Sequence, residues 1–127
     1  MPDTASVPPP PLDPGIVLAK ATLKAATLLG FTGTVLGKVI GLSEASISRI
    51  GMGGRPLQPT TKEGELAALL VRAFSALDAM AGNDSQRRIA WLTSHNKALN
   101  GTPKELMQTV QGLVQVTVYL DGMRTKI

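Results

Sequence analysis

The stretch FTGTVLGKVIGLSEASISRI, residues 31–50, has the pattern of two short helices that meet at a sharp turn. Such a pair needs a glycine in the turn, a small residue where the helices touch, and apolar residues at fixed offsets that hold the angle. Gly41 supplies the turn and Gly37 the small residue, and Ser43 is expected to cap the second helix. The apolar residues expected to hold the angle are Leu36, Ile40, Leu42, Ile47 and Ile50.

This segment resembles the helix-turn-helix of Xre-type regulators. The resemblance implies that the second helix faces the base edges of DNA with an outward row made of Ser43, Glu44, Ala45, Ser48 and Arg49. Arg55 and Lys62 are candidates for contacts with the DNA backbone. One arginine and one carboxylate are nevertheless a weak set for a major groove, where several Arg, Lys, Gln or Asn side chains are usual. Two interpretations stay open: sequence-specific DNA binding, and a helix-turn-helix kept mainly as a scaffold or dimerisation surface.

Towards the N-terminus the chain is first rich in proline and then helical. Residues 1–12 contain five prolines without a periodic apolar pattern, which predicts a disordered or polyproline arm. Asp13 and Pro14 then have the order of a cap and a first helical residue, and Gly30 is expected to end this helix.

After the paired helices, the sequence predicts the longest helix of the chain. Thr60 and Glu63 have the spacing of a capping box, and Gly82 is expected to end the helix. Its apolar face contains Leu66, Leu69, Leu70, Ala73, Phe74 and Leu77. The predicted divisions of the chain are therefore an arm at 1–12, a helix-turn-helix domain at 13–82 and a second helical module at 83–127.

The second module contains a further helix start. Thr102 and Glu105 again have the spacing of a capping box, and Pro103 fits the first helical position because its missing N–H costs nothing there. A helix is therefore expected to begin at about Pro103. Its expected apolar face contains Leu106, Val110, Leu113, Val114 and Val118, although the β-branched residues at 116–119 favour a strand locally.

The spacing of residues in this module also carries a family resemblance. The matching residues are Ala90, Trp91, Leu92, Asn96, Ala98, Leu99, Gly101, Thr102, Pro103, Glu105, Leu106 and Met107. This pattern resembles the C-terminal domain of the Xre/MbcA/ParS antitoxins, over roughly residues 85–124. The resemblance implies that the chain binds and neutralises a RES-domain toxin by blocking its NAD-binding cleft. It also implies that the toxin either degrades NAD or transfers its ADP-ribose to a protein, so that NAD belongs to the toxin.

Several residues of this module are candidates for contact with the toxin. Basic residues Arg87, Arg88, Lys97 and Lys104 occur without a carboxylate between Asp84 and Glu105. They form either a solvated helix face or a patch that faces a partner. His95 and Asn96 lie within the family-like pattern, and His95 is otherwise an ordinary loop residue.

The end of the chain is a second candidate for toxin contact. Gly122 is a natural helix stop, after which the last residues are expected to leave the packed region: Met123, Arg124, Thr125, Lys126 and Ile127. A tail with two cations and a terminal carboxylate fits a cleft built for a dinucleotide phosphate. A frayed terminus is the alternative.

Composition limits the other classes of function. The chain has no cysteine, a lone His95 and acidic residues that are scattered singly, so we expect neither an enzyme nor a metal site nor a cofactor. Its apolar runs end at a charge well before the length of a membrane span, which predicts a soluble, cytoplasmic protein. The expected protein is an all-α antitoxin that acts as a homodimer, with operator DNA as a second candidate partner. A stand-alone helix-turn-helix repressor is the alternative.

Overall fold

The computed structural model describes residues 7–9 and 12–125. This part of the chain forms seven helices: α1 (Pro14–Leu28), α2 (Gly33–Ile40), α3 (Glu44–Gly51), α4 (Lys62–Ala81), α5 (Ser85–Thr93), α6 (Pro103–Leu106) and α7 (Val110–Thr125). The described residues contain no strand, so the expected all-α fold is confirmed. The proline-rich arm predicted at 1–12 lies outside the described residues except for 7–9 and 12. None of the described helices is both long and apolar enough to cross a membrane.

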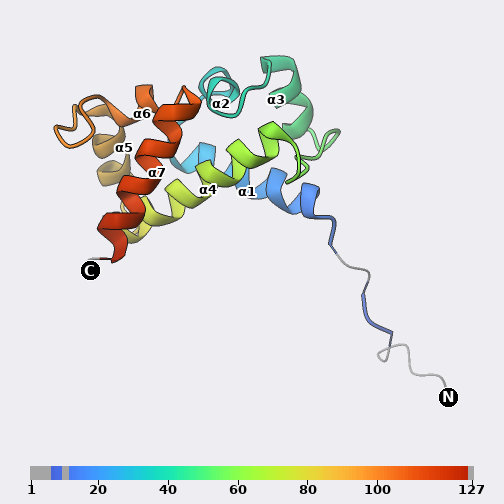
Figure 1. Cartoon of the computed structure of the whole chain (residues 1–127). Coiled ribbons are helices and arrows are strands. Elements are labelled where there is room, and N and C mark those ends of the chain that lie inside the picture. The colour runs from blue at the N-terminus through green and yellow to red at the C-terminus, as the bar shows by residue number, and fades with distance from the viewer. Residues whose placement is uncertain (1–6, 10–11, 126–127) are drawn as a thin grey trace.

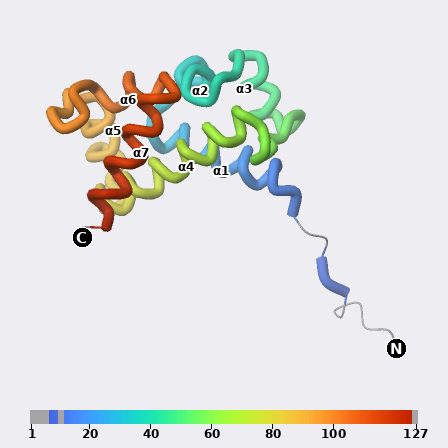
Figure 2. Tube along the Cα trace, viewed as in Figure 1, coloured from blue at the N-terminus to red at the C-terminus, as the bar shows by residue number. Residues whose placement is uncertain are grey.

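Helix α4 is the centre of the molecule, because α1, α2, α5 and α7 all pack against it (Figure 1). One continuous core results, with Ile40, Leu70 and Leu113 fully buried. Figure 2 shows α7 lying across α4, in agreement with the contacts between these two helices. The Lys104 ammonium of α6 lies 6.0 Å from the ring centre of Phe31, just before α2, so segments far apart in the sequence meet there.

Two helices begin with the same local device, a threonine followed three residues later by a glycine. The Thr61 hydroxyl donates to the carbonyl of Gln58 (2.8 Å) and accepts from the N–H of Gly64 (3.1 Å) at the start of α4. A Cβ on Gly64 would overlap the Gln58 carbonyl oxygen, so only glycine permits this closeness. The predicted capping box at Thr60 is therefore wrong by one residue.

The start of α7 repeats this geometry. The Thr109 hydroxyl donates to the carbonyl of Leu106 (3.2 Å) and accepts from the N–H of Gly112 (3.0 Å). A Cβ on Gly112 would overlap the Leu106 carbonyl oxygen. The predicted capping box at Thr102 is wrong, since its side chain makes no cap hydrogen bond. The single helix predicted from Pro103 is thus two helices, with the break between α6 and α7.

The register of α7 also differs from the prediction. Its buried side is formed by Gly112, Leu113, Val116, Thr117 and Leu120. The valines predicted for the core lie on the opposite side, with Val110, Val114 and Val118 exposed at 60%, 41% and 65%. The reason is local, because Gly112 has to face the Leu106 carbonyl and this contact fixes the rotation of the helix.

Gly122 does not stop α7, which continues to Thr125. Asp121 pairs with Arg72 of α4 at 2.6 Å, and the Arg124 guanidinium donates to the Ser75 hydroxyl at 3.5 Å. These contacts keep the last turn beside α4, so the predicted departure from the packed region is wrong as far as Thr125. Lys126 and Ile127 lie outside the described residues.

Candidate functional site

The angle between α2 and α3 depends on two glycines, as the sequence predicts. Gly41 has a φ of 77°, in the left-handed region that favours glycine. A Cβ on Gly37 would lie 2.5 Å from the carbonyl oxygen of Leu42, so a small residue is needed where the helices touch. The apolar residues predicted to hold the angle lie in the core: Leu36, Ile40, Ile47 and Ile50 are buried, and Leu42 is half-buried. This geometry is that of a helix-turn-helix.

The outward row of α3 is exposed as expected. Ser43 accepts from the N–H of Ser46 at 3.2 Å and caps the helix, while Ala45, Ser48 and Arg49 are open to solvent. Glu44 accepts a hydrogen bond from the hydroxyl of Thr34 on α2. The row is accessible to a partner such as DNA, and a single arginine and a single carboxylate supply its charge.

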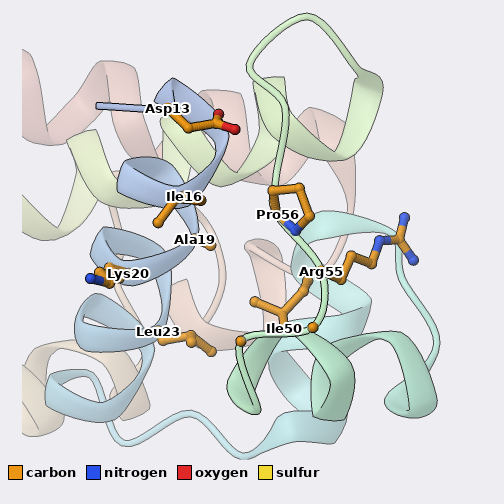
Figure 3. Close-up of a pocket in the computed structure, with 10 residues that line it drawn as sticks. Asp13, Ile16, Ala19, Lys20, Leu23, Ile50, Arg55 and Pro56 are labelled. Atoms are coloured by element: carbon orange, nitrogen blue, oxygen red, sulfur yellow. The ribbon is translucent and has the colours of Figure 1, made fainter. Parts of the chain in front are cut away.

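Arg55 is engaged through both terminal nitrogens of its guanidinium. Nη1 donates to the Ser46 hydroxyl (2.8 Å), and Nη2 pairs with Glu63 of α4 (3.2 Å). Arg49 is more exposed and makes one such bond, from Nη2 to the same Ser46 hydroxyl at 3.1 Å. With 31% of its side chain exposed, Arg55 braces α3 against α4. Together with Ile50 and Pro56 it also lines a pocket of about 190 Å³ beside α1, although its guanidinium extends away from α1 in Figure 3.

The loop after α5 is closed by Asn96. Its backbone N–H donates to the carbonyl of Gly101 (2.9 Å), and its side-chain oxygen accepts from the N–H of Leu99 (3.1 Å). Asn96 therefore shapes the turn, while the neighbouring side chains of His95, Lys97 and Ala98 are exposed on it. In Figure 1 this loop, in orange, lies at the end of the molecule opposite to α3.

Arg88 does not belong to an exposed patch, which corrects the expectation from sequence. Only 3% of its side chain is exposed, and Nη1 pairs with Asp78 of α4 at 2.7 Å. Its guanidinium carbon also lies 5.8 Å from the ring centre of Phe74. The role of Arg88 is to attach α5 to α4. No pattern in the sequence indicates this pair, since its partners are ten residues apart and on different helices.

Arg87 points the other way and is exposed. It lines a pocket of about 180 Å³ together with Leu77, Met80, Ala81 and Trp91. Trp91 is only half-buried, and its ring stacks on that of Tyr119 with the centroids 6.3 Å apart and the planes at 18°. Sequence reasoning missed this pocket, because its walls come from two successive helices, α4 and α5, whose packing angle is set by contacts between them.

The candidate toxin-contacting residues are therefore divided among three places. Arg87 lies in the first turn of α5, His95 and Lys97 lie on the loop after it, and Arg124 lies in the last turn of α7. Met123 is half-buried, whereas Arg124 and Thr125 are exposed. Lys104 is half-buried beside Phe31.

Two family models cover almost all of the described chain. Residues 12–72 match the antitoxin Xre-like helix-turn-helix domain. Residues 76–126 match the antitoxin Xre/MbcA/ParS C-terminal toxin-binding domain. The chain belongs to the Xre/MbcA/ParS antitoxin family. No match was found among curated proteins.

Membership in this antitoxin family agrees with the resemblance seen in the sequence and explains the two-part organisation. The helix-turn-helix belongs to the first matched range, and the loop of Asn96, the pocket beside Trp91 and α7 belong to the second. Helix α4 spans the junction of the two ranges, so a single helix joins the helix-turn-helix domain to the toxin-binding domain.

Proposed function

We propose that this chain neutralises a RES-domain toxin in the cytoplasm and does so by blocking the NAD-binding cleft of the toxin. The observation that carries the proposal is the match of residues 76–126 to a toxin-binding domain. Arg87, Lys97 and Arg124 are exposed in this range, together with the carboxylates of Asp84 and Glu105. Exposed cations are suited to a complementary acidic surface on a partner.

The end of α7 is the part of the domain that we propose to enter the cleft. Leu120 is the last buried residue of the described helix, and a Cβ on Gly122 would have nothing within 4 Å. The turn that follows has no side chain at Gly122 and ends in the exposed residues Arg124 and Thr125. An exposed helix end of this kind is accessible to a cleft on a partner.

Co-expression and an activity assay test this proposal together. The chain is co-expressed with a RES-domain toxin, taken from the neighbouring reading frame where that frame encodes one, and host growth, co-purification and NAD consumption by the purified toxin are measured. The full chain should rescue growth and suppress NAD consumption. Removal of residues 124–127 should leave folding and co-purification intact and restore NAD consumption.

A matched control tests whether inhibition depends on where the positive charges lie or only on the net charge of the chain. The double variant Lys20→Ala, Lys24→Ala removes two exposed cations from α1, outside the toxin-binding domain, and should inhibit like the unaltered chain. If the chain without residues 124–127 inhibits the toxin equally well, the end of α7 is not the blocking element. If the full chain neither rescues growth nor co-purifies, a RES-domain toxin is the wrong partner.

We also propose that the antitoxin binds its operator as a homodimer. The exposed row of α3 supports this role, and a dimer would present two such helices to a two-fold symmetric site. Because one α3 offers a single arginine, Arg49→Ala should weaken operator binding and reduce the dependence of the binding constant on salt. Arg55→Met should instead lower the folding stability of the chain. A stand-alone repressor would instead bind its operator without any need for residues 83–127.

A further inference from the structure

From Val110 to Leu120 the exposed side of α7 is apolar and carries no charge. Val110, Val114 and Val118 lie four residues apart, on one side of the helix, and remain 41–65% exposed. Gln111 and Gln115 are the exposed neighbours of this row, and no acidic or basic residue occurs from Val110 to Leu120. Single exposed apolar residues are ordinary, but a row on one helix face is typical of an interaction surface.

The row is symmetric about Val114. Val110 and Val118 each lie four residues from it, which is about 6 Å along the helix axis. If a two-fold axis passes through Val114, two antiparallel copies of α7 place Val114 against its own equivalent and Val110 against the equivalent of Val118. The face is therefore complementary to itself.

The distribution of charge favours a symmetric contact between two chains through α7 over one through α1. Ile16 and Val17 of α1 are also about half exposed, but Lys20 and Lys24 follow them in exposed positions on the same helix. A symmetric contact through α1 would bring lysines of the two copies together, and like charges across an interface are unfavourable. Two chains that each have a net charge of +4 repel one another, so an uncharged face is where they can approach.

We propose that two copies of this chain pair through the valine row of α7, antiparallel and about an axis at Val114. The inference rests on the homodimer named under the proposed function and gives its interface. The outward row of α3 and the loop that contains His95 and Lys97 lie outside this interface, so both remain accessible to their partners.

Disulfide cross-linking tests the geometry directly, because the chain has no native cysteine. Val114→Cys should form a covalent dimer on mild oxidation, since the two thiols lie on the axis. Val110→Cys alone and Val118→Cys alone should not, because each thiol lies about 12 Å along the helix from its equivalent, beyond disulfide reach. An equimolar mixture of Val110→Cys and Val118→Cys should cross-link.

Sedimentation equilibrium tests the interface without a cross-link. Val114→Asp should weaken self-association at least about tenfold, because it brings two unpaired carboxylates together on the axis. Val17→Asp is the matched control, since Val17 is 47% exposed on α1, and it should leave self-association unchanged. Circular dichroism of both variants checks that each remains folded.

Three results would overturn the inference: an unaltered chain that sediments as a monomer, a Val110→Cys variant that cross-links as well as Val114→Cys, or a Val114→Asp variant that remains dimeric.

Co-purification of each variant with the toxin distinguishes a failure of this interface from a failure of the proposed function. A Val114→Asp chain that is monomeric and still captures the toxin supports the interface. A Val114→Asp chain that stays dimeric and no longer captures the toxin would show that the valine row binds the toxin instead.

Discussion

The helix-turn-helix half and the toxin-binding half of this antitoxin are built from similar helices that are held in place by different means. In the first half, two of the predicted caps form over a few residues: Asp13 accepts from the N–H of Gly15 at 2.8 Å, and Ser43 accepts from that of Ser46. In the second half, α5 is attached by the buried pair of Arg88 with Asp78, which lies on another helix. Local patterns therefore determine the first half, whereas contacts between distant segments determine the second.

The largest expected effect comes from the ion pairs that attach each half to α4. Asp78→Ala should lower the free energy of unfolding by about 3 kcal/mol, because it leaves the guanidinium of Arg88 buried and uncompensated. Arg88 already has one buried nitrogen, Nε, without a hydrogen-bond partner. Glu63→Ala removes the equivalent partner of the more exposed Arg55 and should cost about 1 kcal/mol or less. Urea denaturation of the two variants measures the difference.

A double variant shows whether the loss comes from the charge left behind. Asp78→Leu with Arg88→Met removes both charges and keeps much of the volume, so most of the lost stability should return. Equal effects of Asp78→Ala and Glu63→Ala would mean that the two halves are attached to α4 in the same way, and the contrast drawn between them would fail.

The next largest effect comes from Gly64 and Gly112, the glycines that follow the capping threonines. Here the two halves should lose similar amounts of stability. Gly64→Ala and Gly112→Ala should each cost about 2 kcal/mol, because the added Cβ meets a backbone carbonyl that cannot move freely. Thermal unfolding of both variants measures this cost.

Gly122→Ala is the control for these glycines, since it lies in α7 with open space around it. It should raise stability by up to about 1 kcal/mol, as alanine favours a helix over glycine. A Gly112→Ala chain as stable as this control would show that the Leu106 carbonyl does not fix the start of α7.

The same contrast explains how far the sequence could predict the molecule. The paired helices α2 and α3 were predictable because Gly37, Gly41 and Ser43 act on residues within five positions. The register of α7 was not, because a glycine three residues after Thr109 looked like a weak helix former rather than a point of close approach. Of the candidate site, the exposed row of α3 followed from the resemblance to the Xre-type helix-turn-helix. The burial of Arg88 did not, since it depends on Asp78 and Phe74 of a helix that the sequence cannot orient.

The smallest expected effect concerns the helix caps. It compares a threonine that only has the capping-box spacing with residues that make a cap hydrogen bond in the structure. Thr109→Ala should cost about 1 kcal/mol, as should Ser43→Ala in the other half, because each removes an acceptor for a backbone N–H at a helix start. Thr102→Ala should change stability by only a few tenths of a kcal/mol, although Thr102 and Glu105 have the capping-box spacing, because its hydroxyl caps nothing. Chemical denaturation of the three variants under one condition ranks them. If Thr102→Ala proves as costly as Thr109→Ala, the Thr102 hydroxyl caps α6, and the toxin-binding half would follow local rules as closely as the helix-turn-helix does.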